Sequence, residues 1–147
     1  MALTLSDSFC VERFRPEFRE LVSEYVDLLF ANEAEITSLY EVENFDDALQ
    51  AARKDVEHGA ITRSEKGCVI LEGDEVHIID ALPVSEVVDT TGAGDQFAAG
   101  FLYGMTNGKA VAESGRLGVL AASEVISHMG GRPRKNLKEL AEAHELI

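Results

Sequence analysis

Basic residues are scarce in this sequence, and their scarcity limits what the protein can bind. Lys and Arg number 13 against 27 Asp and Glu, so the formal net charge is -14 at pH 7. Nonspecific nucleic-acid binding needs a cationic surface that displaces counterions from the phosphate backbone. We therefore expect no nucleic-acid partner. A bound phosphate has to be held locally, by backbone N–H groups, by a metal ion or by a few placed cations.

Cysteines, histidine motifs and long apolar runs are also scarce. Cys10 and Cys68 are far apart and fit no metal-ligand spacing, which favours reduced, buried thiols. The four histidines form no HxxxH or HExxH pattern, so we expect structural or surface roles for them. No apolar run approaches the length that spans a bilayer. The first six residues lack a basic region and a sustained apolar stretch, so we expect no signal peptide, no membrane partner and a cytoplasmic location.

The remaining composition is that of an ordinary globular domain. The 147 residues fit one domain, and they are 46% hydrophobic and 27% charged. Short β-branched runs alternate with helical stretches, which predicts an α/β fold with a mostly parallel sheet. A turn at Gly73-Asp74 predicts a β-hairpin. Strands are expected at residues 3–5, 26–30, 60–62, 68–71, 76–79 and 84–88.

Helices are expected at five places. Pro16 suits the first turn of the first helix, and Asn136 suits the cap of the last, through Leu146. The others cover residues 46–56, a stretch that begins near Gly94, and residues 111–128. The helix near Gly94 should bury Phe97, Ala98, Phe101, Leu102 and Met105.

The segment 87–100 carries the strongest chemical signal. A β-branched run enters the turn Gly92-Ala93-Gly94, and the turn enters a helix. Glycines permit positive φ angles and let a ligand approach the backbone N–H groups closely. The helix N-terminus adds unpaired donors and a partial positive charge. Together these features predict an anion site that needs no basic side chain.

Asp95 stands at the mouth of this predicted site. A carboxylate there can accept a proton from a hydroxyl that attacks phosphorus. The alternative is that residues 92–94 form only a tight turn and that Asp95 is only a first-turn helix carboxylate. A dinucleotide fingerprint would need a third glycine at Phe97, and the stretch 104–110 lacks the spacing and the final hydroxyl of a Walker A loop.

The sequence Asp89-Thr90-Thr91-Gly92-Ala93-Gly94-Asp95, followed by Gln96-Phe97-Ala98-Ala99-Gly100-Phe101, resembles the C-terminal signature of the ribokinase-like (PfkB) carbohydrate and nucleoside kinases. The resemblance implies an α/β/α three-layer sandwich, of which this chain is the C-terminal portion. It also implies ATP-dependent phosphorylation of a sugar or nucleoside hydroxyl. Asp95 would be the base, and Gly92, Ala93 and Gly94 would form the anion hole.

Two further elements extend the resemblance. Asn32-Glu33-Ala34-Glu35 resembles the N-x-x-E element of the family, which implies that Asn32 and Glu35 order Mg²⁺ and phosphate. Read alone, these residues are a helix cap with acidic residues in its first turn. Residues 61–67 resemble the T-x-G-x-x-G element beside the nucleotide phosphates. Thr62 and Gly67 match it and Ser64 replaces its first glycine; the alternative is a polar connection between two strands.

The resemblance also implies a monovalent cation, such as K⁺, beside the anion hole. Asp89 and the backbone carbonyl of Thr91 would bind it; alternatively, Asp89 caps the turn through an Asx-type hydrogen bond. In the family the region of Gly115, Gly118 and Ala122 packs near the adenine, and close helix packing explains the same small residues.

The N-terminal residues depart from the D-x-N-x-R stretch of many sugar kinases. Asp7 matches its first residue and the Asn is absent, which is similar to bacterial adenosine-kinase-like members. Only about the C-terminal half of a family member is matched; the N-terminal substrate-binding and lid portion is absent. We therefore expect the isolated chain to be inactive, with ATP and a sugar or nucleoside as ligands of the parent enzyme. Alternatives are a nucleotide-binding module without catalysis, one half of a split protein, and a homo-oligomer.

Overall fold

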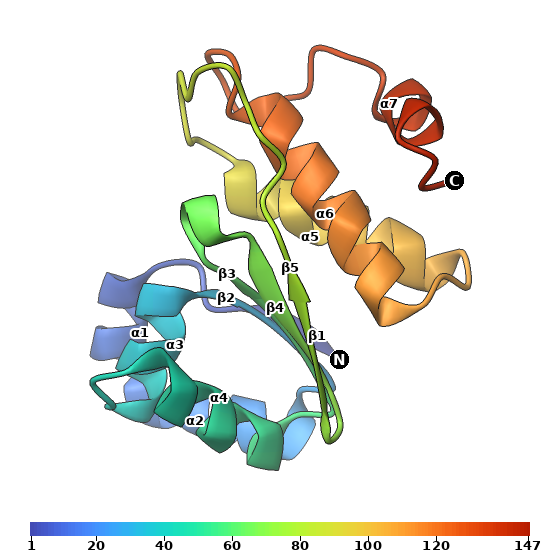
Figure 1. The fold of residues 1–147 in the computed structure, drawn as a ribbon. Coiled ribbons are helices and arrows are strands. Elements are labelled where there is room, and N and C mark those ends of the chain that lie inside the picture. The colour runs from blue at the N-terminus through green and yellow to red at the C-terminus, as the bar shows by residue number, and fades with distance from the viewer. The chain divides into compact units, whose positions relative to one another are not determined.

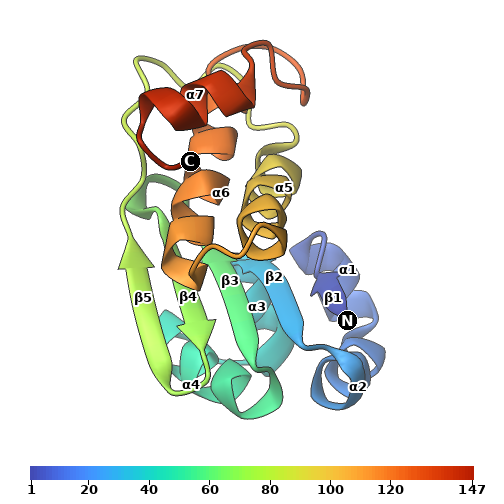
Figure 2. The same cartoon turned by 90° about the vertical axis from the view of Figure 1, so that its right-hand side faces the viewer.

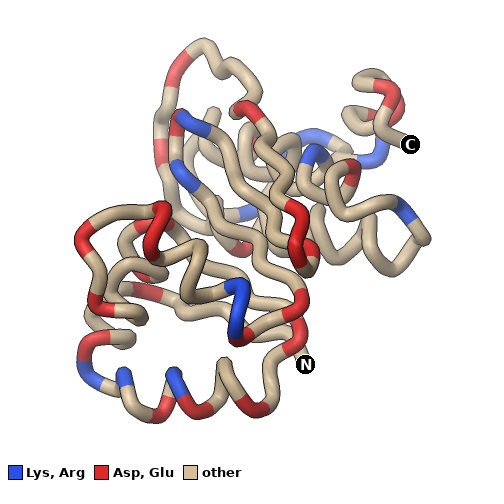
Figure 3. The backbone as a smooth tube through the Cα atoms, turned by 60° about the horizontal axis from the view of Figure 1, so that its bottom comes forward, with Lys and Arg blue, Asp and Glu red and all other residues tan.

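The computed structural model describes residues 1–147, which form two compact units (Figure 1). The first unit comprises residues 1–63 and 69–78, and the second comprises residues 64–68 and 79–147. No helix combines the length and the apolar character that crossing a membrane requires. Acidic residues outnumber basic ones along the backbone, as Figure 3 shows.

The first unit is built on a five-stranded sheet in the spatial order β1-β2-β3-β4-β5. The strands β1 and β2 pair in parallel, and so do β2 and β3. Figure 2 shows β4 and β5 running in opposite directions, joined by the turn at Gly73-Asp74, which confirms the predicted hairpin. The strands are β1 (Ala2–Thr4), β2 (Leu28–Asn32), β3 (His58–Thr62), β4 (Cys68–Glu72) and β5 (Glu75–Ile79).

Four helices of the first unit cover one face of this sheet (Figure 1). Their apolar sides and the sheet share one core, which includes the fully buried Leu29, Ile36 and Ile61. Each such side chain contributes about 1.5–3 kcal/mol by leaving water. The helices are α1 (Ser8–Arg13), α2 (Arg15–Tyr25), α3 (Glu33–Tyr40) and α4 (Phe45–Asp55). Pro16 lies in the first turn of α2, as predicted.

Polar caps explain why two short helices, α1 and α3, form where the periodicity gave no helix. Asp7, which the family pattern singled out, caps α1 by accepting a hydrogen bond from the N–H of Cys10 at 2.7 Å. Asn32 both ends β2 and caps α3, so the strand passes directly into a helix. Such a cap stabilises a helix by roughly 1 kcal/mol.

The second unit contains the short 3₁₀ turn η1 and three helices. The helices α5 and α6 pack closely because glycines remove side chains where they meet. A Cβ at Gly100 would lie 2.5 Å from the carbonyl oxygen of Leu117, and a Cβ at Gly118 would lie 2.8 Å from the ring of Phe97. Close packing is thus the role of Gly118 that the structure shows. The elements are η1 (Ser64–Lys66), α5 (Ala93–Thr106), α6 (Val111–Val125) and α7 (Leu137–Ala143).

Three details of the second unit differ from the sequence-based expectations. Residues 84–88 are not a strand: the N–H of Val88 donates to the carbonyl of Ile126 at 2.8 Å, and no strand lies alongside to complete a ladder. The helix α5 buries Phe97 and Phe101 but leaves Leu102 exposed. The helix α6 ends at Val125, three residues before the expected end.

Candidate anion-binding site

The glycine turn leaves backbone donors unpaired at the start of α5. The N-cap residue of α5 is Gly92, which has no side chain to cap the helix. The N–H of Ala93 donates to the carbonyl of Thr90 at 3.2 Å, whereas the N–H groups of Gly94 and Asp95 have no acceptor in the chain. The first N–H groups of a helix need an outside partner. The turn therefore presents unpaired donors that suit an anion.

The two glycines of the turn do different things. Gly92 has a φ of 76°, and a Cβ there would lie 2.9 Å from the backbone of Gly131. Gly92 is therefore required by the backbone itself. Gly94 has helical angles, and a Cβ there would meet nothing within 4 Å. The open space over Gly94 adjoins the unpaired donors, so only this glycine suits close approach of a ligand.

Asp95 is exposed in the first turn of α5 and makes no hydrogen bond or ion pair within the chain. A first-turn carboxylate often folds back onto the N-cap N–H, as Glu35 and Glu113 do in α3 and α6. Asp95 does not, so its oxygens remain available to a ligand. The arrangement has two parts, donors for a negative group and a free carboxylate beside them.

Asp89 fastens the turn to the loop that follows α6. One carboxylate oxygen accepts the N–H of Thr91 at 2.9 Å, and the other accepts the N–H of Gly130 at 2.8 Å. Hydrogen bonds from Thr91 and then Gly130 lower the pKa of Asp89 to about 2. The Asx-type contact that the sequence left open is thus present. Each oxygen accepts one N–H and keeps a further lone pair, so the binding of a monovalent cation by Asp89 stays a prediction.

We expect acid to release this contact. Because the pKa of Asp89 falls from 3.8 to about 2 on folding, its contribution to stability is complete above pH 3.8 and is lost as the pH falls toward 2. Hydrogen exchange of the Gly130 N–H, followed by NMR between pH 5 and pH 2, should accelerate beyond the intrinsic rate in that window. In Asp89→Asn the acceleration should be absent. An identical pH response in both proteins would show that the contact does not hold the loop.

Asn32 and Glu35 meet at the start of α3 as a capping box. The side-chain oxygen of Asn32 accepts the N–H of Glu35 at 2.8 Å, while the Glu35 carboxylate accepts from the backbone and side-chain N–H groups of Asn32, each at 2.9 Å. Burial raises the pKa of Glu35, although the Asn32 N–H opposes the shift and Asp7 adds to it. The helix-cap alternative is therefore what the structure shows. Each side-chain oxygen of the pair accepts one hydrogen bond and keeps a further lone pair, so the role of the pair in ordering Mg²⁺ stays a prediction.

The T-x-G-x-x-G-like element is shaped by backbone constraints. Thr62 ends β3 directly opposite Asn32 in the β2–β3 register, so these two candidate residues do meet. Ser64, which replaces the family's glycine, has a φ of 53°, a left-handed angle that favours glycine. Gly67 has a φ of 79°, and a Cβ there would overlap the carbonyl oxygen of Ile79 and lie 2.6 Å from the nitrogen of Ala81. A close backbone approach thus requires Gly67.

The structure groups the candidate residues by unit. In the first unit it brings together Asn32, Glu35 and Thr62. In the second it brings together Asp89, Thr91 and the turn at 92–95, all within the loop that leads into α5 and the first turn of that helix. Ser64 and Gly67 also belong to the second unit, where the N–H of Gly67 donates to the Ser64 carbonyl at 3.1 Å.

Sequence reasoning missed two charged residues. Arg63, next to Thr62, donates two hydrogen bonds to Glu33 at 2.9 and 3.2 Å and lies 3.9 Å from the centre of the Phe45 ring. Glu124 is buried on α6 and binds the loop that follows. The signal for Glu124 was its position, seven residues after Leu117 on the apolar side of a helix, where a charge requires partners.

Comparison with known proteins identifies the family and the fold. A model of the pfkB family of carbohydrate kinases matches residues 2–137. The chain belongs to this family. The resemblance to the pfkB family that the sequence motifs indicated is therefore confirmed. The predicted ribokinase-like α/β fold class is also confirmed, because solved kinases similar in sequence superpose on the chain.

Three solved members of the pfkB family illustrate the similarity. A probable sugar kinase from Rhizobium etli is 49% identical with a TM-score of 0.98, over 100% of this chain and 45% of its own. The adenosine kinase from Sinorhizobium meliloti is 48% identical with a TM-score of 0.95, over 97% of this chain and 44% of its own. Arabidopsis thaliana ribokinase is 29% identical with a TM-score of 0.74, over 84% of this chain and 42% of its own. The chain thus spans less than half the length of these three relatives.

Proposed function

We propose that this chain is the ATP-binding and catalytic portion of a pfkB-family kinase that phosphorylates a hydroxyl group of a sugar or nucleoside. The observation that carries the proposal is that unpaired N–H groups at Gly94 and Asp95 occur beside the free carboxylate of Asp95. The sugar and nucleoside kinases among its relatives support the acceptor class, and the A. thaliana ribokinase was solved with ribose and ATP.

In this proposal each part of the turn has one task. The Asp95 carboxylate takes the proton of the acceptor hydroxyl as its oxygen bonds to the γ-phosphorus of ATP. The bond between that phosphorus and the β–γ bridging oxygen breaks, and ADP leaves. The unpaired N–H groups of Gly94 and Asp95 at the mouth of α5 stabilise negative charge on the transferred group, whereas Gly92 and Ala93 shape the turn, because the Ala93 N–H already donates to the Thr90 carbonyl. Thr62, Ser64 and Gly67 line the nucleotide.

A metal ion would accompany ATP, because Mg²⁺ neutralises phosphate oxygens and retains several of its own waters. The oxygens of Asn32 and Glu35 already accept hydrogen bonds, so they would reach such an ion through water rather than as direct ligands. For the monovalent cation, the carbonyl of Thr91 would be one ligand, and a remaining lone pair of the Asp89 carboxylate, which also holds two N–H groups, would be another.

Substitution of Gly94 tests the binding half of the proposal. We expect Gly94→Ala to leave thermal unfolding almost unchanged, because its Cβ enters open space at helical angles. The same methyl group stands where a phosphate approaches, so we expect the Kd for Mg·ATP, measured by isothermal titration calorimetry, to rise about tenfold or more, the effect of losing one charge-assisted hydrogen bond.

Gly73→Ala is a control for this comparison, since that glycine lies in the β4–β5 turn and its Cβ would also enter open space. It should not weaken Mg·ATP binding. Equal Mg·ATP affinity in the wild-type chain and Gly94→Ala would contradict the anion-hole assignment.

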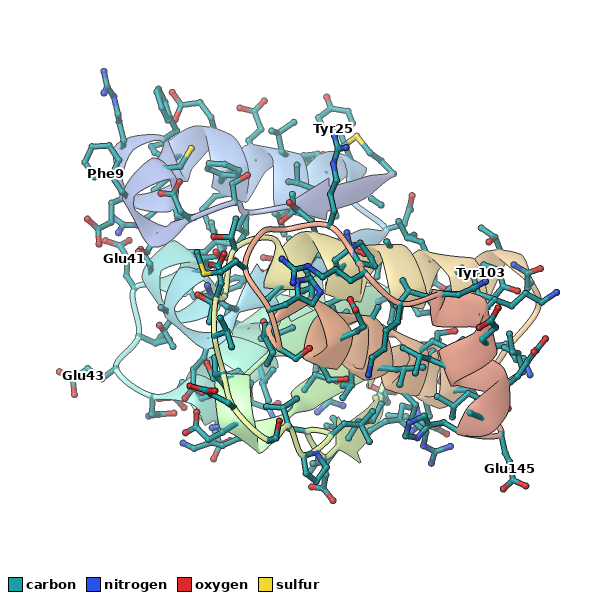
Figure 4. All side chains as sticks on the ribbon, turned by 90° about the horizontal axis from the view of Figure 1, so that it is seen from above. Phe9, Tyr25, Glu41, Glu43, Tyr103 and Glu145 are labelled. Atoms are coloured by element: carbon teal, nitrogen blue, oxygen red, sulfur yellow. The ribbon has the colours of Figure 1, made fainter.

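The substrate-contacting and lid portion would lie outside these 147 residues, which favours association with a further part. Phe9 on α1 is 70% exposed and Tyr25 at the end of α2 is 61% exposed, and both project away from the helices that carry them (Figure 4). Large exposed aromatic side chains near an outer strand, here β1, are typical of surfaces that another protein part covers.

We therefore expect the isolated chain to self-associate and to transfer no phosphoryl group. Transfer requires an acceptor held in line with the γ-phosphate and the exclusion of water, and this portion contains no recognisable acceptor site or lid. Light scattering should show species larger than the 16.0 kDa monomer. Phe9→Ser together with Tyr25→Ser should reduce the association. A stable monomer, or robust transfer to any sugar or nucleoside, would show that this portion is more complete than proposed.

A further inference from the structure

Glu124 is a buried carboxylate whose partners all come from the chain that follows it. Its Oε1 accepts the N–H groups of Arg134 and Lys135 at 3.1 and 3.0 Å. The Nε2 of His128 lies 3.2 Å from both of its oxygens. These partners lie 4, 10 and 11 positions after Glu124 in the sequence, so the loop is gathered around one side chain of α6. Because the carboxylate is buried, these donors are the groups that replace its water.

These contacts stabilise the ionised form of Glu124. Burial alone would raise its pKa, but hydrogen bonds from the Lys135 N–H, from His128 and from the Arg134 N–H outweigh burial, and the pKa is lowered. The carboxylate is therefore charged at neutral pH, and the contacts that it makes are charge-assisted, about twice as strong as neutral ones. Glu124 holds both ends of the loop 126–135.

The same loop carries the contacts that shape the glycine turn. The carbonyl of Ile126 accepts the N–H of Val88 at 2.8 Å, and the N–H of Gly130 donates to Asp89 at 2.8 Å. The carbonyl of Gly131 accepts a hydrogen bond from the Gln96 side chain at 3.4 Å. Gly131 also packs so closely on Gly92 that a Cβ at Gly92 would lie 2.9 Å from it. The turn is thus contacted before, within and after residue 92 by one loop.

We propose that Glu124 is a positioning residue for the anion-binding turn, and that it acts through the loop 126–135 on Asp89 and Gly92. The hydrogen bonds of the Glu124 side chain go to His128, Arg134 and Lys135 and none goes to the turn. Its effect follows the path from its carboxylate to the loop backbone, and from Gly130 and Gly131 to the turn. The proposal that this placement serves ATP binding rests on the proposed function, whereas the path itself does not.

The variant Glu124→Gln keeps the size of the side chain and removes its charge. We expect the N–H groups of Thr91 and Gly130 to exchange with deuterium at least about tenfold faster, the effect of weakening charge-assisted hydrogen bonds. The exchange of amides in the middle of α5 and α6, such as Phe101, should not change relative to the wild-type chain. The Kd for Mg·ATP should rise by a similar factor.

Ser114→Ala is the matched control. Ser114 is also buried on α6, but its hydroxyl donates to the carbonyl of Ala110 at 3.0 Å, within the start of the same helix rather than to the loop. This variant should leave the exchange of Thr91 and Gly130 and the affinity for Mg·ATP unchanged. If Glu124→Gln does not fold, His128→Ala applies the same test, because it removes one partner of Glu124 and leaves the backbone donors in place.

The exchange and binding measurements separate the two hypotheses. If the wild-type chain does not bind Mg·ATP, the proposed function fails, and the exchange of Thr91 and Gly130 still decides the path from Glu124. Unchanged exchange of these two amides in the folded variant would overturn the positioning role. The same holds for an acceleration that is equal throughout α5 and α6, since that would be global destabilisation.

Discussion

Asp95→Asn is expected to reduce turnover by a factor of about a hundred to ten thousand in an intact kinase that contains this chain, the usual cost of removing a general base. The Asn side chain keeps the size of Asp95 and cannot take a proton from the acceptor hydroxyl. Mg·ATP should still bind, because the N–H groups of the turn are unaltered. Steady-state kinetics with a coupled ADP assay measure the turnover, and calorimetry measures the binding.

A control for charge at a helix start is Glu139→Gln. Glu139 is exposed in the first turn of α7, so its substitution removes the same charge from an equivalent helix position in the second unit. It should leave turnover unchanged. Near-normal turnover in Asp95→Asn, or an equal loss in both variants, would remove Asp95 from the role of base.

Among the glycine substitutions proposed for this protein, Gly67→Ala is expected to lower the free energy of unfolding the most. The Cβ would overlap the carbonyl oxygen of Ile79 and crowd the backbone at Asp80 and Ala81. The alanine would also have to adopt the backbone φ of 79° that Gly67 has. Overpacking against backbone and a left-handed angle together should lower the free energy of unfolding by about 3 kcal/mol or more. Urea denaturation followed by circular dichroism measures the change.

Gly73→Ala separates the two causes. Gly73 also has a positive φ, 54°, but a Cβ there would meet nothing within 4 Å. Its loss should be limited to about 1–2 kcal/mol, the cost of the left-handed angle. Similar losses in the two variants would show that the close approach to Ile79 does not constrain Gly67. The result also bears on the family element, because a glycine that the backbone requires needs no nucleotide to explain it.

Sequence reasoning succeeded where a feature depends on neighbouring residues. The helix behind Pro16, the hairpin at Gly73-Asp74 and the cap at Asn136 each follow from local turn and capping chemistry, and each is present. A helix start near Gly94 was also expected, and α5 begins at Ala93; a glycine turn before a helix leaves donors unpaired whatever lies elsewhere in the chain. The family signature added the prediction that Asp95 is the base.

Local patterns failed where the partner lies far away in the chain. Residues 84–88 have the β-branched composition of a strand, but the N–H of Val88 finds its acceptor at Ile126 rather than in a sheet.

The sequence by itself determined the order of glycine turn and helix around residues 92–106, the presence of a carboxylate at the mouth of the turn, and the membership of the pfkB family. Only the tertiary structure decided which glycine the turn requires, since Gly92 is constrained by Gly131, nearly forty positions along the chain, whereas Gly94 faces open space. It likewise decided that Glu124 is buried and holds the loop that carries Gly130 and Gly131. The physical reason is that φ preferences and helix caps act over a few residues, whereas burial and steric contact depend on segments that only folding brings together.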